Sequence, residues 1–236
     1  MRELLSGGLK TLGIDYTEEV LDKFSCYWKL LQSKNKVMNL TAITDETEAV
    51  QLHFLDCAAV LRCIDLKNIS CIDIGTGAGF PGLVLKLLEP SLDLTLFDSL
   101  EKRLEFLRNV GKELNLSELK FVHGRAEEAA HDENLREKFD VATARAVARL
   151  DLLCELCLPF VRVGGKFLAM NSIDTVQELN SALPVAKRLG AKFEDSSEYI
   201  IPGTDISRLV SIFFKTESTL NLYPRRWAKL QKVYSV

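Results

Sequence analysis

The glycine-rich stretch at residues 71–82, CIDIGTGAGFPG, constrains the fold of this chain more than any other feature. It begins with a short apolar run and continues with four glycines within eight positions. Apolar residues followed by a glycine turn and a helix are typical of the first strand of an open α/β sheet, where ligands bind at the carboxyl ends of the strands. The stretch therefore predicts an α/β fold with a ligand at this turn.

Strand and helix patterns alternate through the middle of the chain, which favours one mainly parallel, Rossmann-like sheet of seven strands. Five strands are expected over 70–75, 92–98, 119–124, 139–144 and 165–170, and a last antiparallel pair over 191–200 and 208–215. Helices are expected over 81–88, 101–114, 150–158 and 173–190. We expect the last helix to break near Pro184 and to end at Gly190.

Composition allows one substantial core, because the 236 residues are 47% hydrophobic and 27% charged. Residues 1–65 have helical patterns and no Gly/Pro-rich linker after them, so we expect an N-terminal helical cap that forms one compact unit with residues 66–236. The start of the chain has no signal-peptide pattern, and no apolar run approaches the roughly 20 residues of a membrane span. These features predict a cytoplasmic protein with no membrane partner.

The six cysteines lie mostly in apolar stretches, where reduced thiols behave as small hydrophobes. Cys154 and Cys157 have a C-x-x-C spacing, but no second pair or suitably spaced histidines complete a zinc site. Both fall on one face of the helix expected over 150–158. We therefore interpret them as core residues and expect no metal.

Nucleic-acid binding would depend on local basic patches, since the net charge is −3. One patch, YPRRWAKLQK, contains Arg225 and Arg226, and another, KLLQSKNKVMNLT, contains Lys36 and Asn39. The alternative for both stretches is an ordinary solvated surface.

The turn at Gly77–Gly82 matches the dinucleotide spacing G-x-G-x-x-G, but Asp73 stands before it and Pro81 lies inside it. Asp98, which ends the second strand, can accept hydrogen bonds from a ribose, and both NAD and S-adenosylmethionine contain one. Asp73 would repel a diphosphate and attract the ammonium and sulfonium groups of S-adenosylmethionine. We therefore favour S-adenosylmethionine, with the alternative that Asp73 only holds the loop backbone.

Several stretches, in order along most of the chain, resemble the bacterial 16S ribosomal RNA guanine-N7 methyltransferases, also called glucose-inhibited division protein B. They are NKVMNLTAIT (35–44), HFLD (53–56), DIGTGAGFPG (73–82), FDSLEKRLEFL (97–107), GRAEE (124–128), ARA (144–146) and YPRR (223–226). The resemblance implies a class I S-adenosylmethionine-dependent methyltransferase that acts on guanine N7 in 16S ribosomal RNA. It further implies the small ribosomal subunit or its assembly intermediate as partner, and we expect a monomer.

The resemblance also implies roles for particular residues. The expected cofactor contacts are Asp73, Gly75, Gly77 and Phe80 at the loop, Asp98 at the ribose, Ala126 and Glu127 at the adenine, and Arg145 where cofactor and target base meet. Lys36, Asn39, Arg225 and Arg226 are the expected RNA contacts. Arg145 is also the expected catalytic residue, because packing does not explain a lone arginine in the small-residue run ATARAVA.

Plain structural alternatives exist for some of these residues. Glu127 could be a surface carboxylate at a helix start, and Asn39 could cap a helix that begins near Thr41. His53 is more readily a hydrogen-bonded structural residue than a catalyst. The tail beyond Arg226 departs from the family's Gly/Pro-rich ending.

The expected nucleophile, guanine N7, carries a free lone pair, so methyl transfer needs orientation and desolvation but no proton removal. The fourth strand ends in TARAV rather than the Asn/Asp-Pro-Pro-aromatic motif of enzymes that methylate exocyclic amines, and no cysteine lies in 75–82 or 143–149. Three alternatives stay open: a methyltransferase with a small-molecule or protein substrate, a nicotinamide-dependent dehydrogenase, and a non-catalytic interaction protein.

Overall fold

Seven strands form one sheet in the order β3-β2-β1-β4-β5-β7-β6, in a computed structural model that describes residues 1–145, 148–172 and 176–234. The strands are β1 (Ser70–Ile74), β2 (Asp93–Asp98), β3 (Leu119–His123), β4 (Phe139–Arg145), β5 (Val161–Ser172), β6 (Ala191–Ile200) and β7 (Ser207–Lys215). β1 to β5 pair in parallel, and β7 runs antiparallel to both β5 and β6. The predicted sheet, with its antiparallel C-terminal pair, is confirmed.

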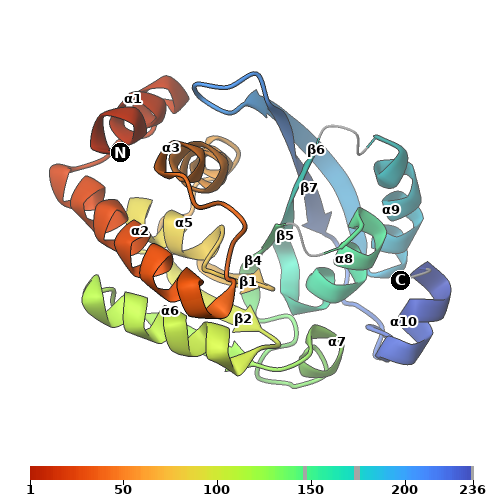
Figure 1. The fold of residues 1–236 in the computed structure, drawn as a ribbon. Helices are drawn as coiled ribbons and strands as arrows, with labels where there is room; N and C mark the ends of the chain where they lie inside the picture. The colour runs from red at the N-terminus through yellow and green to blue at the C-terminus, as the bar shows by residue number, and fades with distance from the viewer. Residues whose placement is uncertain (146–147, 173–175, 235–236) are drawn as a thin grey trace.

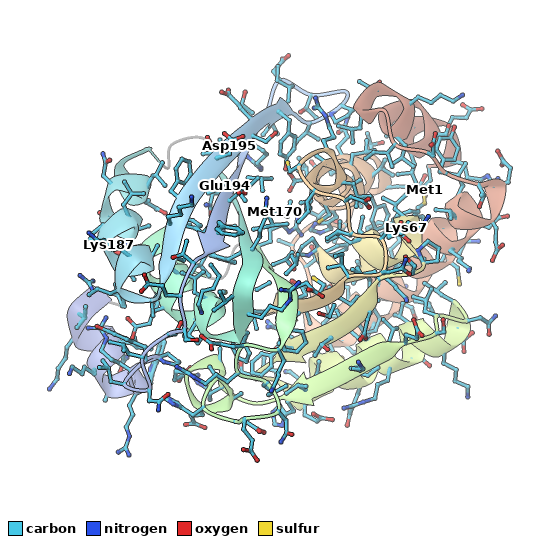
Figure 2. The ribbon with its side chains drawn as sticks, turned by 180° about the vertical axis from the view of Figure 1, so that it is seen from behind. Met1, Lys67, Met170, Lys187, Glu194 and Asp195 are labelled. Carbon is cyan, nitrogen blue, oxygen red and sulfur yellow. The ribbon has the colours of Figure 1, made fainter. Side chains whose placement is uncertain are left out.

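Helices cover both faces of the sheet (Figure 1). One face carries α5 (Gly82–Leu88) and α6 (Glu101–Glu113), and the other carries α8 (Leu150–Cys157) and α9 (Val176–Arg188). The short α7 (Ala126–Ala129) and the C-terminal α10 (Trp227–Tyr234) lie near α8. Figure 2, seen from behind, places Met170 near the centre, with Lys187 and Lys67 to either side of the sheet.

The N-terminal helices lie over α5 and α6 (Figure 1). They are α1 (Arg2–Leu12), α2 (Glu18–Met38), α3 (Glu46–Ala49), the π-helical turn η1 (Val50–Leu55), α4 (Asp56–Ala58) and the 3-10 turn η2 (Ala59–Arg62). Their buried side chains, such as Phe24 and Phe54, belong to the same core cluster as Leu83 and Leu107 of the sheet-covering helices. Because one apolar cluster joins the two regions, the N-terminal helices need the sheet to bury their apolar faces.

One local expectation and one structural alternative are wrong. α9 continues through Pro184, because packing of its buried face, which includes Ala182 and Ala186, outweighs the local cost of a proline in a helix. Asn39 does not begin a helix: it ends α2 in the left-handed conformation, with φ at 50°. The next helix begins after Asp45, whose side chain accepts the Glu48 N–H at 2.9 Å.

Two other expectations are confirmed, and one strand begins earlier than expected. Gly190 follows α9 with a φ of 76°, a conformation that glycine adopts without strain. Cys154 and Cys157 are fully buried on α8, as expected for core residues. The strand expected from residue 165 begins earlier, at Val161, and Gly165 lies within it where a Cβ would stand 2.5 Å from the backbone oxygen of Asp140.

Candidate active site

The glycine loop leaves the carboxyl end of β1 and is held by the neighbouring strand. The N–H groups of Gly75 and Thr76 donate to the carbonyl of Phe97, and the Gly77 N–H donates to Asp98 Oδ2 at 2.9 Å. Gly77 has a φ of 59°, and a Cβ there would meet nothing closer than 3.9 Å. Hydrogen bonds to β2 therefore hold the loop in place, and space remains beside the Cα atom of Gly77.

Asp73 lies beneath the loop and is fully buried. Its Oδ2 accepts the Gly82 N–H at 3.0 Å and its Oδ1 accepts the Thr143 hydroxyl at 3.1 Å. Burial raises the pKa of this carboxyl to about 6, although these hydrogen bonds oppose the rise. The contacts are those of a residue that holds the loop, and a direct contact between Asp73 and a cofactor stays a prediction.

A cavity of about 190 Å³, here called the strand-end cavity, opens beside the loop. Its walls come from the ends of β1, β2 and β3, from α8 and from α10, and include Gly75, Phe97, Ala126, Glu127, Leu152 and Trp227. The structure thus brings together Gly75, Ala126 and Glu127, three of the expected cofactor contacts. Asp98 is buried and does not line the cavity, whereas its neighbours Phe97 and Ser99 do.

A second cavity of about 490 Å³, the cap-side cavity, lies between the N-terminal helices and the other half of the sheet edge. Its polar lining residues are His53, Asp56, Arg145, Asn171, Glu178 and Arg208. Ala148 lines both cavities, so they are neighbours at the end of β4. A ligand in the strand-end cavity and a ligand in the cap-side cavity could therefore meet beside Ala148.

Arg145, at the end of β4, is held by the N-terminal helices. Its Nη1 donates to the Leu52 carbonyl at 2.8 Å and to Asp56 Oδ2 at 3.1 Å, and its Nη2 donates to His53 Nδ1 at 3.1 Å. The guanidinium also lies 5.1 Å from the ring centroid of Phe80. An arginine has five N–H donors, so two have no hydrogen-bond acceptor within residues 1–145, 148–172 and 176–234.

His53 is neutral and fully engaged. Since arginine can only donate, Nδ1 of His53 is the acceptor and its Nε2–H donates to the Thr41 hydroxyl at 2.8 Å. Burial and the neighbouring Arg145 lower the pKa of His53 to about 3. The ring also stacks on Phe80, with centroids 4.4 Å apart. These contacts agree with a structural role, and they place Phe80 beneath the cap rather than on the wall of the strand-end cavity.

The residues expected to bind RNA have different surroundings. Lys36 and Asn39 are exposed and line a cavity of about 440 Å³ beside α2, and Arg226 is also exposed. Arg225 instead donates through Nε to Glu155 Oε1 at 2.8 Å, and Glu155 is fully buried. Arg225 therefore has a clear structural role, and its contact with RNA stays a prediction.

Sequence reasoning missed three residues that the fold brings to the site. Asp56 stands in the HFLD stretch, which could have identified it, and its Oδ1 accepts the Tyr199 hydroxyl at 2.8 Å. Arg208 is the second residue of β7, and an antiparallel strand begins at the end of the sheet where its parallel neighbours end. Trp227 carried no signal for the strand-end cavity, because its place depends on how the tail returns across the sheet.

Comparison with known proteins identifies the family of this chain. The family model GidB, described as rRNA small subunit methyltransferase G, matches residues 20–194. The chain belongs to this family. Membership confirms the predicted enzyme class and the predicted cofactor, since these proteins are S-adenosylmethionine-dependent methyltransferases.

Two curated relatives match over nearly their full lengths. The ribosomal RNA small subunit methyltransferase G of Acetivibrio thermocellus is 44% identical over 98% of this chain and 96% of its own. The protein of the same name from Lachnoclostridium phytofermentans is 42% identical over 96% of this chain and 94% of its own. Among solved structures, a methyltransferase from Pyrococcus furiosus shares the fold with a TM-score of 0.55 and 15% identity, over 83% of this chain and 99% of that one.

Two further observations concern membranes and metals. None of the helices within the described part of the chain is long and apolar enough to cross a membrane. The same residues contain no group of three or more His, Cys, Asp or Glu side chains that could hold a metal ion.

Proposed function

We propose that this chain transfers the methyl group of S-adenosylmethionine to N7 of a guanine in 16S ribosomal RNA. The observation that carries the proposal is the pair of cavities that meet at Ala148, one beside the glycine loop and one beside Arg145. A cofactor in the first and a target base in the second would bring the two reacting atoms to the end of β4.

The strand-end cavity suits the adenosine part of the cofactor. Apolar walls from Phe97 and Leu152 fit the faces of a purine, and the carboxylate of Glu127 is 5% exposed on the same wall. The loop beside it is free of side chains at Gly75 and Gly77, which allows close approach of a ligand to the backbone. When bound, S-adenosylmethionine supplies an electrophilic methyl group on its sulfonium.

Arg145 is proposed to hold the target guanine. Arg145 lines a cavity whose wall also includes Arg208, and either cation could donate to guanine O6 or to an adjacent phosphate. Asp56 and the Leu52 carbonyl hold the guanidinium in place, so little ordering is needed when the base enters.

The polar groups of the cap-side cavity fit a reaction without proton removal. Both ring nitrogens of His53 are engaged, and its lowered pKa makes it a weak base. The two oxygens of Asp56 accept from Arg145 and Tyr199. Glu178 accepts the Leu150 N–H at the start of α8 through Oε2. Guanine N7 needs no base, whereas an exocyclic amine would lose a proton.

The direct test is transfer of a radiolabelled methyl group to small ribosomal subunits purified from a strain that lacks this protein. We expect labelling of small subunits and none of large subunits. Arg145→Lys, which keeps a charge beside Asp56 but loses the planar donors, should lower the rate by about 10². Arg162→Lys makes the same change near the start of β5, at a residue that lines neither cavity. It is the matched control and should leave the rate unchanged.

Unlabelled small subunits, with the protein folded and binding S-adenosylmethionine, would contradict the RNA substrate and favour a small-molecule or protein substrate. Comparing naked 16S RNA, an assembly intermediate and the finished subunit in the same assay identifies which form is methylated.

A further inference from the structure

We infer that Trp227, the first residue of α10, forms the outer wall of the strand-end cavity and stacks on the adenine of the bound cofactor. The inference rests on the proposed function, because it requires S-adenosylmethionine in that cavity. Trp227 lines the same cavity as Gly75 and Ala126, although it comes from the end of the chain. The C-terminal tail thereby becomes part of the cofactor site.

Arg125 holds the indole at this position. Its guanidinium carbon lies 4.6 Å from the ring centroid of Trp227, within the range of a cation–π contact. The Nε of Arg125 donates to Glu127 Oε1 at 3.0 Å, and Glu127 is almost fully buried. The indole is therefore connected through Arg125 to the residue expected beside the adenine.

The chain just before Trp227 is fixed at three successive residues. Arg136 Nη1 donates to the carbonyl of Tyr223, and His131 Nε2 bonds the carbonyl of Pro224, both at 2.9 Å. Arg225 pairs with the buried Glu155 of α8. With its anchor points set before any ligand arrives, Trp227 can bind a ring at little cost in conformational entropy.

The shape and chemistry of the cavity fit a purine against an aromatic wall. Leu152 and Leu156 of α8 also line it and supply apolar surface. Its volume of about 190 Å³ is below the roughly 300 Å³ at which ligand pockets begin, so it suits part of a ligand, such as a base. Trp227 is 36% exposed, and a stacked base would cover some of that surface.

The first experiment measures the dissociation constants of S-adenosylmethionine and S-adenosylhomocysteine by calorimetry. Trp227→Ala should weaken both by about tenfold, the scale of one aromatic–base stack. Trp227→Phe keeps an aromatic ring and should stay within about threefold of the parent. Val233→Ala, an exposed apolar position on the same helix that does not line the cavity, is the matched control and should change nothing.

A second measurement uses fluorescence and needs no activity. The chain has two tryptophans, so Trp28→Phe leaves Trp227 as the sole reporter. Trp28 is buried and its Nε1 has no hydrogen-bond partner in the described part of the chain, so phenylalanine removes no hydrogen bond. S-adenosylhomocysteine should quench Trp227 in this variant and leave the emission of Trp28 unchanged in Trp227→Phe.

The outcomes separate the two proposals. A parent protein that binds no S-adenosylmethionine overturns the proposed function and this inference together. If the parent binds S-adenosylmethionine and Trp227→Ala binds it equally well, only the role of Trp227 is overturned. The same holds if the emission of Trp227 does not change when the ligand is added.

Discussion

Asp98 holds the glycine loop and is also the proposed acceptor for the ribose hydroxyls of the cofactor. Its Oδ2 accepts the Gly77 N–H and its Oδ1 accepts the Leu100 N–H, both at 2.9 Å, so the carboxylate joins the end of β2 to the glycine turn. Removing it would lose the proposed acceptor for ribose hydroxyls and also release the loop.

Asp98→Ala should therefore weaken S-adenosylmethionine binding by about 1–3 kcal/mol, the cost of losing a charged hydrogen-bond acceptor. Asp98→Asn keeps an oxygen that can accept the Gly77 N–H, so it should lose less. Calorimetry on the two variants compares these effects. An unchanged dissociation constant in Asp98→Ala would remove Asp98 from the site.

His53 predicts a dependence of stability on pH. Its pKa is about 3 in the folded chain and about 6.5 when exposed, so between these values the unfolded chain binds more protons. Lowering the pH from about 6 should therefore cost the parent about 1.4 kcal/mol of unfolding free energy per pH unit through His53. Asp73, whose raised pKa has the opposite effect, is common to parent and variant.

Urea unfolding of the parent and of His53→Gln at several pH values between about 7 and 4.5 isolates this contribution. The difference in unfolding free energy should shift in favour of the variant as the pH falls. A difference that stays constant with pH would mean that His53 is not held neutral.

Among single residues, the sequence identifies those whose type is unusual for their position. Arg145 stands out among small residues, and Asp98 ends a strand. The contacts that orient Arg145 cannot be found in that way, because Asp56 of α4 accepts from Arg145 and from Tyr199 of β6, and the three meet only in the folded chain.

Among the elements, the C-terminal tail combines structure with a basic surface. Arg225 and Tyr234 both bond the buried Glu155 and so hold α10 against α8. Arg226, beside it in sequence, is exposed, and with Lys229 and Lys232 it lines an open cavity on the surface of the tail. Adjacent arginines therefore have separable roles.

Arg225→Ala should lower the unfolding free energy by about 3–5 kcal/mol, because it leaves the buried Glu155 carboxylate without its cationic partner. Arg226→Ala should change stability by no more than about 0.5 kcal/mol, but should weaken RNA binding and flatten its salt dependence. Thermal unfolding and salt titrations of RNA affinity measure the two effects. If the salt slope of Arg226→Ala equals that of the parent, the tail is only a solvated surface.

Elements were predictable where the local pattern and the packing agree. The period-two and helical patterns of β2 and α6 identify both from the sequence alone. α9 differs, because a proline predicts a break and only the burial of Ala182 and Ala186 against the rest of the fold keeps the helix continuous.

In the whole molecule, two apolar clusters lie on the two faces of one sheet, and the N-terminal helices share the first with α5 and α6. Alternation of strands and helices was enough to predict this architecture, since crossover connections place helices on both faces of a parallel sheet. The meeting of two cavities at Ala148 was beyond sequence reasoning, because it depends on where the cap and the tail settle on the sheet edge.

The most direct test of the central claim identifies the methylated atom. Methylation at guanine N7 places a fixed positive charge on the imidazole ring, so borohydride reduction followed by aniline should cleave 16S RNA treated with this protein at one guanine. RNA from a strain lacking the protein should resist at that site. Methylated RNA that survives this treatment uncut would contradict the N7 product. It would also contradict the proposal that the reaction in the cap-side cavity needs no general base.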